Sequence, residues 1–501
     1  MRRTIVALSA LALAGGCDPG DFGAALDKAP VQYISAPSGF GSNVGRTLLA
    51  LPPPQDRPTV AARLLFAGTD TASLAWADFD GDGKAHVQSA SGDDLRALIE
   101  PSDQSQGGIT SAAWLNGPGA AGTILLGMPN LGSGAPAGRI AFLNLGADTS
   151  VNVALQQASL QPGASTDGPA GTQPRGHFGL AVARGQVTQT TNDETNDEAI
   201  VVSDNGVSVL SITNGLLAST TCTGALATPL DRHRSLAVGN FLDDADGVHR
   251  QEIAVGLPVK GGTGKVFILR YGINPASPSS PPGLFCAGTV NFPDQGGIPA
   301  VGGYGTALAA VDDLNGDGLA ELVVGAPPDR AYLFYSPFDG SPKYTRFTKV
   351  RVVTVSGVTM ADPNTPDSAS EFGQRVALVD IDGDGSKELA VTALQADVGG
   401  TPKAGQVLVY RLPGAPVEVK TPIAVVYDSN PIANTGFFGI GLADLEFDSS
   451  RVCPNHKDGG QQDKHVLVVG DDLGIFAFFR FAGIADPTTA ITRDDPRCFA
   501  Q

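Results

Sequence analysis

Short apolar segments and polar loops alternate along the chain in an order that repeats. Each repeat begins with a short apolar strand, often opened by an aromatic residue and glycine, as at 177–183, 304–311, 371–379 and 437–443. A polar or acidic loop follows, and then a β-branched strand, as at 124–129, 200–205, 253–258, 321–327, 388–393 and 466–472. A further strand comes next at 94–99, 138–145, 206–212, 264–272, 330–337, 405–412 and 474–481. No helical periodicity separates these segments, so the pattern predicts an all-β repeat fold.

The number of repeats is seven when the loops that begin at Asp78 and Asp444 are taken as the first and the last, with a mean spacing of about 61 residues. A unit of this size holds a four-stranded sheet with its turns. The sequence therefore predicts a seven-bladed β-propeller with four-stranded blades over 36–485. A solenoid is the alternative, but it would need capping segments that are not evident. We expect part of 46–67 to close the ring by completing the last blade, and 146–176 and 273–303 to be insertions between blade strands.

The N-terminal segment has the pattern of an export signal. Arg2 and Arg3 precede an apolar run at 5–14, and small residues lead to Cys17. Roughly ten apolar residues are too few to span a bilayer, so 1–17 is predicted to be a signal peptide. The residues before Cys17 resemble a bacterial lipobox, whose cysteine is lipidated, although Leu13 stands one place further away than usual. An ordinary signal peptide is the alternative. We expect an exported chain anchored in the cell envelope by lipid on Cys17, with a flexible spacer at 18–35.

Composition supports the predicted fold class, and the net charge excludes one class of binding partner. The 501 residues include 64 Gly, 36 Pro and 42% hydrophobic residues, which is typical of many short strands and tight turns around a large core. The net charge of −18 would repel phosphates, so nucleic acid is excluded as a partner.

Four cysteines remain apart from Cys17, and none of them forms a CxxC pair. In an exported chain an even number predicts disulfides. Of the three connectivities, we favour Cys222 with Cys286 and Cys453 with Cys498, because each pair brackets one repeat. The second pair would tie down a C-terminal tail at 486–501. Free buried thiols are the alternative.

Three acidic loops have the spacing of calcium ligands. Calcium takes six to eight hard oxygens, and a glycine in the sixth place permits the tight turn. The ligand positions are Asp78, Asp80 and Asp82; Asp313, Asn315 and Asp317; and Asp380, Asp382 and Asp384. The twelfth positions, Ser89, Val324 and Val391, lack the glutamate of an EF-hand. The ninth positions supply Glu321 and Glu388 in the second and third loops, whereas the first loop has His86, a poor calcium ligand. The sequence predicts two Ca²⁺ sites and a weaker third. Acidic turns that only solvate hairpins are the alternative.

At this point the chain resembles a known family. The segments FGQRVALVDIDGDGSKELAVTA (372–393) and YGTALAAVDDLNGDGLAELVVGAP (304–327) are similar to FG-GAP repeats, which occur in integrin α-subunit propellers and in many exported bacterial proteins. The resemblance implies a seven-bladed propeller with calcium in loops that join adjacent strands of a blade. Other loops depart from the motif: 115–123 has no acidic residue, and 191–198 and 241–252 keep acidic residues at altered spacing.

Three functions remain to be weighed. We expect a non-enzymatic binding or adhesion module for an extracellular or envelope protein or glycan, since the family resemblance points that way and the sequence contains no GxSxG, HExxH or Walker motif. An extracellular hydrolase or lyase acting on polysaccharide or lipid is the first alternative, because propellers also carry active sites. A passive component of envelope assembly is the second. Fold alone does not name the ligand.

Overall fold

The computed structural model describes most of the predicted propeller. The described residues are 5–8, 31–37, 40, 43–54, 57–68, 73–80, 84–90, 108–116, 122–130, 138–144, 158–160, 177–188, 197–204, 206–211, 215–220, 235–243, 250–259, 264–293, 303–338, 343–355, 358–366, 369–381, 384–398, 401–428, 438–448, 465–472 and 474–478.

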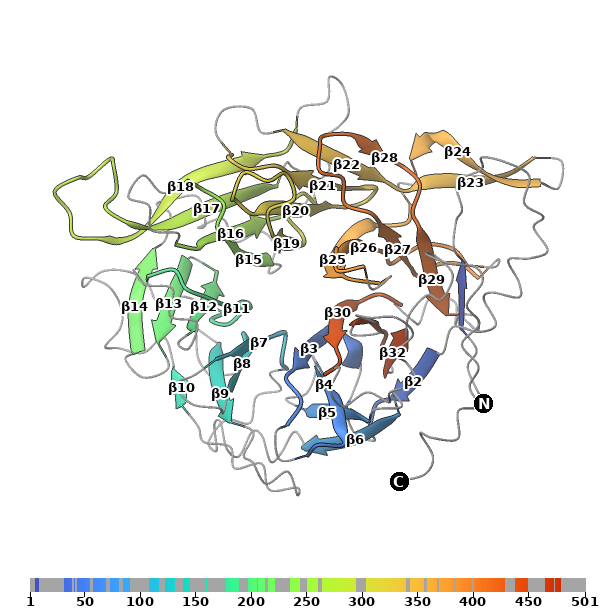
Figure 1. Ribbon diagram of the computed structural model, residues 1–501, viewed down its shortest axis with the longest axis horizontal. Helices are drawn as coiled ribbons and strands as arrows, with labels where there is room; N and C mark the ends of the chain where they lie inside the picture. The colour runs from blue at the N-terminus through green and yellow to red at the C-terminus, as the bar shows by residue number, and fades with distance from the viewer. Residues whose placement is uncertain are drawn as a thin grey trace.

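Seven antiparallel four-stranded sheets stand in a ring around a central axis, as Figure 1 shows. The first four blades are β3 (Thr47–Leu51), β4 (Val60–Ala67), β5 (Leu74–Asp80) and β6 (Ala85–Ala90); β7 (Ser111–Leu115), β8 (Thr123–Met128), β9 (Arg139–Asn144) and β10 (Ala158–Leu160); β11 (Ala181–Gly185), β12 (Glu198–Ser203), β13 (Gly206–Ser211) and β14 (Gly215–Thr220); and β15 (Ser235–Gly239), β16 (Glu252–Leu257), β17 (Lys265–Gly272) and β18 (Gly283–Asn291). The other three are β19 (Leu308–Val311), β20 (Glu321–Ala326), β21 (Arg330–Phe334) and β22 (Tyr344–Thr348); β25 (Phe372–Val379), β26 (Glu388–Ala393), β27 (Gln406–Tyr410) and β29 (Ala424–Asp428); and β30 (Gly441–Glu446), β31 (His465–Gly470), β32 (Gly474–Phe478) and β2 (Val31–Ser35). The prediction of a seven-bladed β-propeller is confirmed.

A few elements lie outside this plan. β28 (Glu418–Val419) pairs in parallel with β22, and β1 (Ile5–Leu8) lies along β29 at the outer edge of the sixth blade. β23 (Val350–Val355) and β24 (Val358–Pro366) form a separate hairpin, which lies at the periphery of the ring in Figure 1. β1 falls within the predicted signal peptide, which stays a prediction. Among the described residues, the helical element is the short η1 (Val44–Arg46), and no helix is long and apolar enough to cross a membrane.

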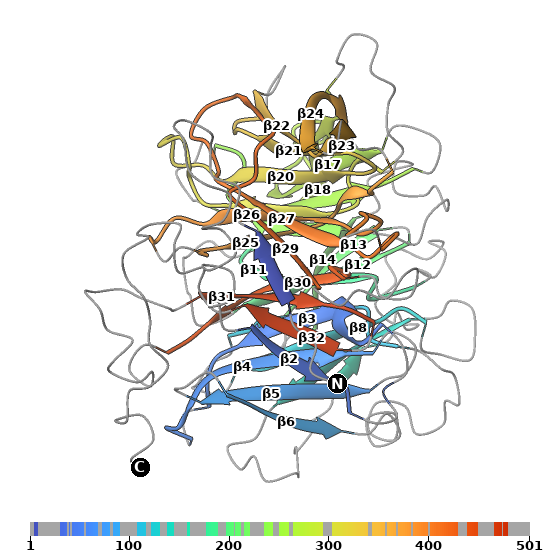
Figure 2. The same cartoon turned by 90° about the vertical axis from the view of Figure 1, so that its right-hand side faces the viewer.

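Ring closure differs from the expectation. Residues 46–67 do not complete the last blade; they form the two inner strands of the first blade, β3 and β4. The closing strand is β2, at the end of the predicted spacer, which pairs antiparallel with β32. The last blade therefore combines strands from both ends of the chain, as Figure 2 shows where β2 lies beside β32. This closure holds the two ends of the chain together within one blade, so the ring is closed by strand pairing.

Two stretches expected to be insertions contain blade strands instead. Within 273–303 lies β18, the outer strand of the fourth blade, and within 146–176 lies β10, the outer strand of the second. The segment 94–99, which was expected to be a strand, is outside the described residues.

The core is divided among the interfaces between blades. Seven clusters of buried apolar side chains are described, one between each pair of neighbouring blades. The cluster between the last and first blades, for example, joins Ile475 and Val468 to Phe66 and Ala77. Second and third strands are buried on both faces, which explains their near-continuous apolar sequence.

A glycine contact links each of several blades to the next. Gly325 on β20 of the fifth blade lies against the backbone of Gly373 at the start of the sixth, and a Cβ on Gly325 would meet Gly373 O at 2.2 Å. Gly373 itself has φ +101, and a Cβ there would lie 2.2 Å from Arg330 O. The same pairing occurs between Gly256 and Gly305. In these blades, the glycine that opens one repeat and the small residue near the end of the second strand of the preceding blade are therefore two halves of one inter-blade contact.

Candidate metal centre

The acidic loop of the fifth blade, between β19 and β20, folds around the carboxylate of Asp313. Oδ1 of Asp313 accepts hydrogen bonds from the backbone N–H groups of Gly316 (2.6 Å) and Asp317 (2.9 Å), and Oδ2 accepts one from Gly318 (2.8 Å). Gly316 and Gly318 have φ of 82 and 84, a conformation that favours glycine. Asn315 Oδ1 accepts a second bond from Asp317 N–H at 2.9 Å. The turn is thus the compact loop that the alternating acidic pattern predicted.

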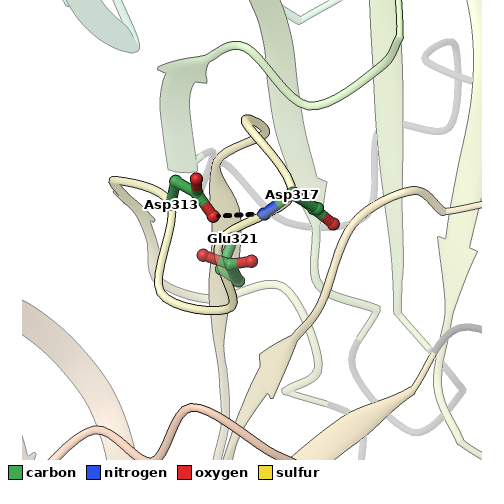
Figure 3. Close-up of side chains that lie close together, drawn as sticks. All are labelled: Asp313, Asp317 and Glu321. Carbon is green, nitrogen blue, oxygen red and sulfur yellow. Dashed lines mark hydrogen bonds between the residues drawn. The ribbon is translucent and has the colours of Figure 1, made fainter.

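Glu321, the first residue of β20, lies beneath this turn. Its side chain is fully buried, and Oε2 accepts the Leu314 N–H at 2.7 Å. Oε1 has no hydrogen-bond partner among the described residues. Ligand atoms of Asp313, Asp317 and Glu321 all lie within 4.8 Å of one another, which Figure 3 shows at close range. The predicted ninth-position glutamate is therefore brought together with the first and fifth positions of the loop.

The electrostatics of this loop suit a bound cation. Burial raises the pKa of Glu321 to about 7, and the negative charges of Asp317 and Asp313 act in the same direction. The Gly318 N–H and neighbouring backbone donors lower the pKa of Asp313, so that group stays ionised. Burying a carboxylate oxygen that accepts no hydrogen bond raises the free energy of the folded state, unless a cation lies next to that oxygen. The donor set consists of hard oxygens only, which fits Ca²⁺: Asp313, Asp317 and Glu321 would hold the ion, and the ion would supply the missing positive charge.

The loop of the sixth blade, between β25 and β26, repeats the arrangement. Asp380 Oδ2 accepts the Gly385 N–H at 2.9 Å, and Glu388 Oε2 accepts the Ile381 N–H at 3.0 Å. Asp380 is 7% exposed and Glu388 3%, and Asp380 Oδ1 has no hydrogen-bond partner in the described part of the chain. Asp384 Oδ1 accepts the Ser386 N–H at 2.7 Å. Asp382 lies outside the described residues. Asp380 and Glu388 thus occupy the places that Asp313 and Glu321 take in the fifth blade.

The predicted site in the first loop has a different setting. Asp78 lies on β5, so its loop joins the third and fourth strands of the first blade rather than the first and second. Both of its oxygens are paired with arginine: Arg63 Nε donates to Oδ1 at 2.6 Å, and Arg57 Nη1 donates to Oδ2 at 3.0 Å. Two guanidinium groups next to a buried carboxylate repel a cation. The prediction that Asp78 binds calcium is therefore not supported by the structure.

The other predicted calcium ligands of the first loop are Asp80 and Asp82. Asp80 Oδ1 accepts the Lys84 N–H at 2.8 Å, and Asp80 Oδ2 lies 3.6 Å from His86 Nε2. Asp82 is outside the described residues.

The place of Glu321 recurs in other blades, and we call it the socket position: the first residue of the second strand, opposite the last residue of the first strand. The socket residues are Glu198, Glu252, Glu321, Glu388 and His465. In the fourth blade Glu252 Oε2 accepts the Phe241 N–H at 2.8 Å, and Arg270 Nε donates to Oε1 at 2.9 Å. In the third blade Glu198 Oε2 accepts the Val187 N–H at 2.6 Å.

The degenerate loops of the third and fourth blades therefore keep the buried glutamate, and other donors in these blades form hydrogen bonds with it. In the fourth blade the guanidinium of Arg270 supplies the positive charge that a metal ion would supply in the fifth. The sequence carried a signal for this, since Glu198 and Glu252 end their polar loops immediately before a β-branched strand. Arg270 could not be matched to Glu252 because it comes from the next strand, β17. In the seventh blade His465 Nδ1 donates to Asp444 Oδ1 at 2.9 Å, and this hydrogen bond raises the pKa of His465.

The predicted cysteine sites are mostly beyond the described residues, which include neither Cys17 nor Cys222, Cys453 or Cys498. Cys286 lies on β18 and is disulfide-bonded. β18 packs beside β14, which ends two residues before Cys222. The pairing of Cys222 with Cys286 stays a prediction.

Similarity to a known repeat family lies in the two blades that carry the acidic loops at Asp313 and Asp380. The FG-GAP repeat model matches residues 304–336 and 372–410, which cover the first three strands of the fifth blade and the first three strands of the sixth. Integrin alpha-4 of Xenopus laevis is 26% identical over 197 residues, which is 36% of this chain and 16% of that protein. A solved structure described as BBS1N in complex with ARL6DN, soaked with lead, is 10% identical and has a TM-score of 0.46, with 93% of this chain and 100% of that chain covered. The chain is thus a seven-bladed β-propeller with FG-GAP repeats in two blades and a local similarity to an integrin α-subunit.

Proposed function

We propose that the chain is an exported, lipid-anchored, calcium-braced β-propeller that binds a protein or glycan at the cell envelope without catalysing a reaction. An FG-GAP β-propeller fits a binding or adhesion module. The observation that carries the calcium part is the buried Glu321: it lies in one cluster with Asp313 and Asp317, and its Oε1 has no hydrogen-bond partner among the described residues. Export and anchoring rest on the signal-peptide pattern and on Cys17.

The role assigned to calcium is structural. The acidic loops of the fifth and sixth blades each join the first two strands of the blade, and the socket glutamate accepts a hydrogen bond from the backbone of the turn. Binding an ion there fixes the hairpin and leaves the rest of the blade surface for a partner. The carboxylates of these loops are committed to holding the turn, which argues against their use as catalytic acids or bases.

A binding experiment tests this function. The mature chain lacking 1–17 is immobilised in 1 mM calcium and exposed to a glycan array and to fractionated envelope proteins, and hits are measured again in excess chelator. We expect saturable binding of one ligand class, weakened in chelator, with the bound ligand recovered unchanged. Recovery of cleaved glycan or lipid would instead support the hydrolase or lyase alternative. Absence of saturable binding in calcium would contradict the proposal.

A further inference from the structure

The socket position of the seventh blade holds a histidine in place of a glutamate. His465 begins β31 and lies opposite Glu446, the last residue of β30. Its Nδ1 donates to the carboxylate of Asp444, at distances of 2.9 and 3.0 Å to the two oxygens. The side chains of His465 and Asp444 are 18% and 16% exposed. A group that gains and loses a proton near neutral pH therefore stands where the fifth and sixth blades have a carboxylate.

Asp444 joins this histidine to the acidic loop of the sixth blade. Lys387 Nζ of that loop lies 3.5 Å from Asp444 Oδ2. Lys387 comes immediately before Glu388, one of the residues that would hold calcium in the sixth blade. β30 packs beside β25, as Figure 1 shows, so the two loops lie at neighbouring strands. Asp444 thus contacts His465 in its own blade and the calcium loop in the next.

Apolar packing holds the two blades together at the same place. Ile381, which follows Asp380, shares one buried cluster with Leu467, two residues after His465. The other elements that pack on β31 bring no charge to His465. β32 has no charged side chain, and η1 meets β31 at Gly470, the end away from His465. The charged groups near His465 are therefore those of β30 and of the sixth-blade loop.

These charged groups favour the protonated form of the histidine. The hydrogen bond to Asp444 is the largest cause that raises the pKa of His465, and burial opposes it. The negative charges of Asp444, Glu446 and Asp380 raise the pKa further. Lys387 lies against Asp444 and partly offsets its charge. Asp380 belongs to the sixth blade, so the charge state of its loop acts on a histidine of the seventh.

We propose that His465 couples proton binding in the seventh blade to calcium binding in the sixth, so that each of the two cations weakens the binding of the other. The imidazolium is attracted by the charge of Asp380, and calcium in the sixth-blade loop would neutralise that charge and add positive charge beside it. Linkage makes the effect reciprocal. The inference rests on the calcium site of the proposed function and adds to it the residue that makes the site sensitive to pH.

Calcium titration by calorimetry tests the coupling. The full chain carries Asp313→Ala and Asp317→Ala to remove the fifth-blade site, because burial raises the pKa of Glu321 in that site to about 7. Calcium affinity is measured at pH 8 and at pH 6 in this chain and after adding His465→Gln, which stays neutral. Between these pH values, we expect the chain with His465 to lose about fivefold more affinity than the chain with His465→Gln.

His177→Gln, added to the same chain, is the matched control. His177 Nδ1 lies 2.5 Å from Asp204 Oδ2, so it also forms a histidine–aspartate pair. This pair belongs to the third blade, which does not border the sixth in the ring of Figure 1. The His177→Gln chain should therefore keep the full pH dependence of calcium affinity.

A second measurement needs no variant of His465. The imidazole of His465 is titrated by NMR in the wild-type chain, in 1 mM calcium and in excess chelator, and its midpoint should lie at lower pH in calcium. An unchanged midpoint, or equal pH dependence of calcium affinity in the His465→Gln and His177→Gln chains, would overturn the coupling and leave the calcium site standing. Absence of calcium binding at pH 8 would contradict the proposed function, and the coupling with it.

Discussion

At the scale of single residues, backbone contact between blades constrains the sequence most tightly. Gly373 combines a positive φ with a position where a Cβ would meet the Arg330 carbonyl oxygen at 2.2 Å. Neither condition can be relieved by a side-chain rotation, since both involve backbone atoms. The glycine of the aromatic–glycine opening is therefore required by the packing of the sixth blade on the fifth.

Replacing Gly373 by alanine should lower the free energy of unfolding by about 2–3 kcal/mol, because the backbone must shift to admit the methyl group. Gly288→Ala is the control: a Cβ at Gly288 in β18 would meet no atom within 4 Å, and its effect should stay within about 0.5 kcal/mol. Urea unfolding of both variants measures the difference. Equal stability of the two would show that the inter-blade contact tolerates a side chain.

At the scale of elements, the hairpin of first strand, loop and second strand is the unit that varies between blades. The buried glutamate at the socket position is retained in four blades. The groups that form hydrogen bonds or ion pairs with its carboxylate differ from blade to blade. Glu252 is satisfied by two backbone donors and by Arg270. Glu321 and Glu388 instead share their turns with further aspartates, and in these two blades the local sequence matched the calcium-loop pattern.

The fourth blade should show a pH dependence that is independent of calcium. Burial raises the pKa of Glu252 from 4.5 to about 7, despite the opposing charge of Arg270. The folded state therefore binds a proton that the unfolded state has lost, so stability falls as pH rises from about 4.5 to about 7 and is level above that. Glu252→Gln should remove this decline, which is on the order of 3 kcal/mol at most.

Urea unfolding from pH 4.5 to 8, in calcium and in chelator, measures the decline for the wild type and for Glu252→Gln. The difference between the two proteins isolates Glu252 from other titrating groups. A difference that does not change with pH would contradict the assignment.

The sequence predicted the elements of the middle and later blades well because their repeats are closely similar. It failed for the first blade, because the loop at Asp78 has the calcium-loop spacing although it joins the third and fourth strands. The pairing of Asp78 with Arg63 crosses from β5 to β4, and no local pattern encodes that contact. Ring closure by β2 was missed for a similar reason: a five-residue strand far from its partner β32 carries little signal of its own.

At the scale of the whole molecule, the ring is held by seven interfaces and by the closure of β2 on β32. Bound calcium would make a modest contribution to the stability of this ring. With a dissociation constant of order 0.1 mM, as in extracellular modules, 1 mM calcium would stabilise the fold by about 1.4 kcal/mol per site. Two sites would therefore raise the melting temperature measurably without deciding whether the chain folds.

The most direct test is thermal unfolding of the full chain in 1 mM calcium and in excess chelator. We predict a higher melting temperature in calcium, with the shift roughly halved by Asp380→Ala combined with Asp384→Ala and abolished when Asp313→Ala and Asp317→Ala are added. Asp80→Asn, in the first loop, should leave the shift unchanged. Superimposable melting curves of the wild-type chain in calcium and in chelator would contradict the account.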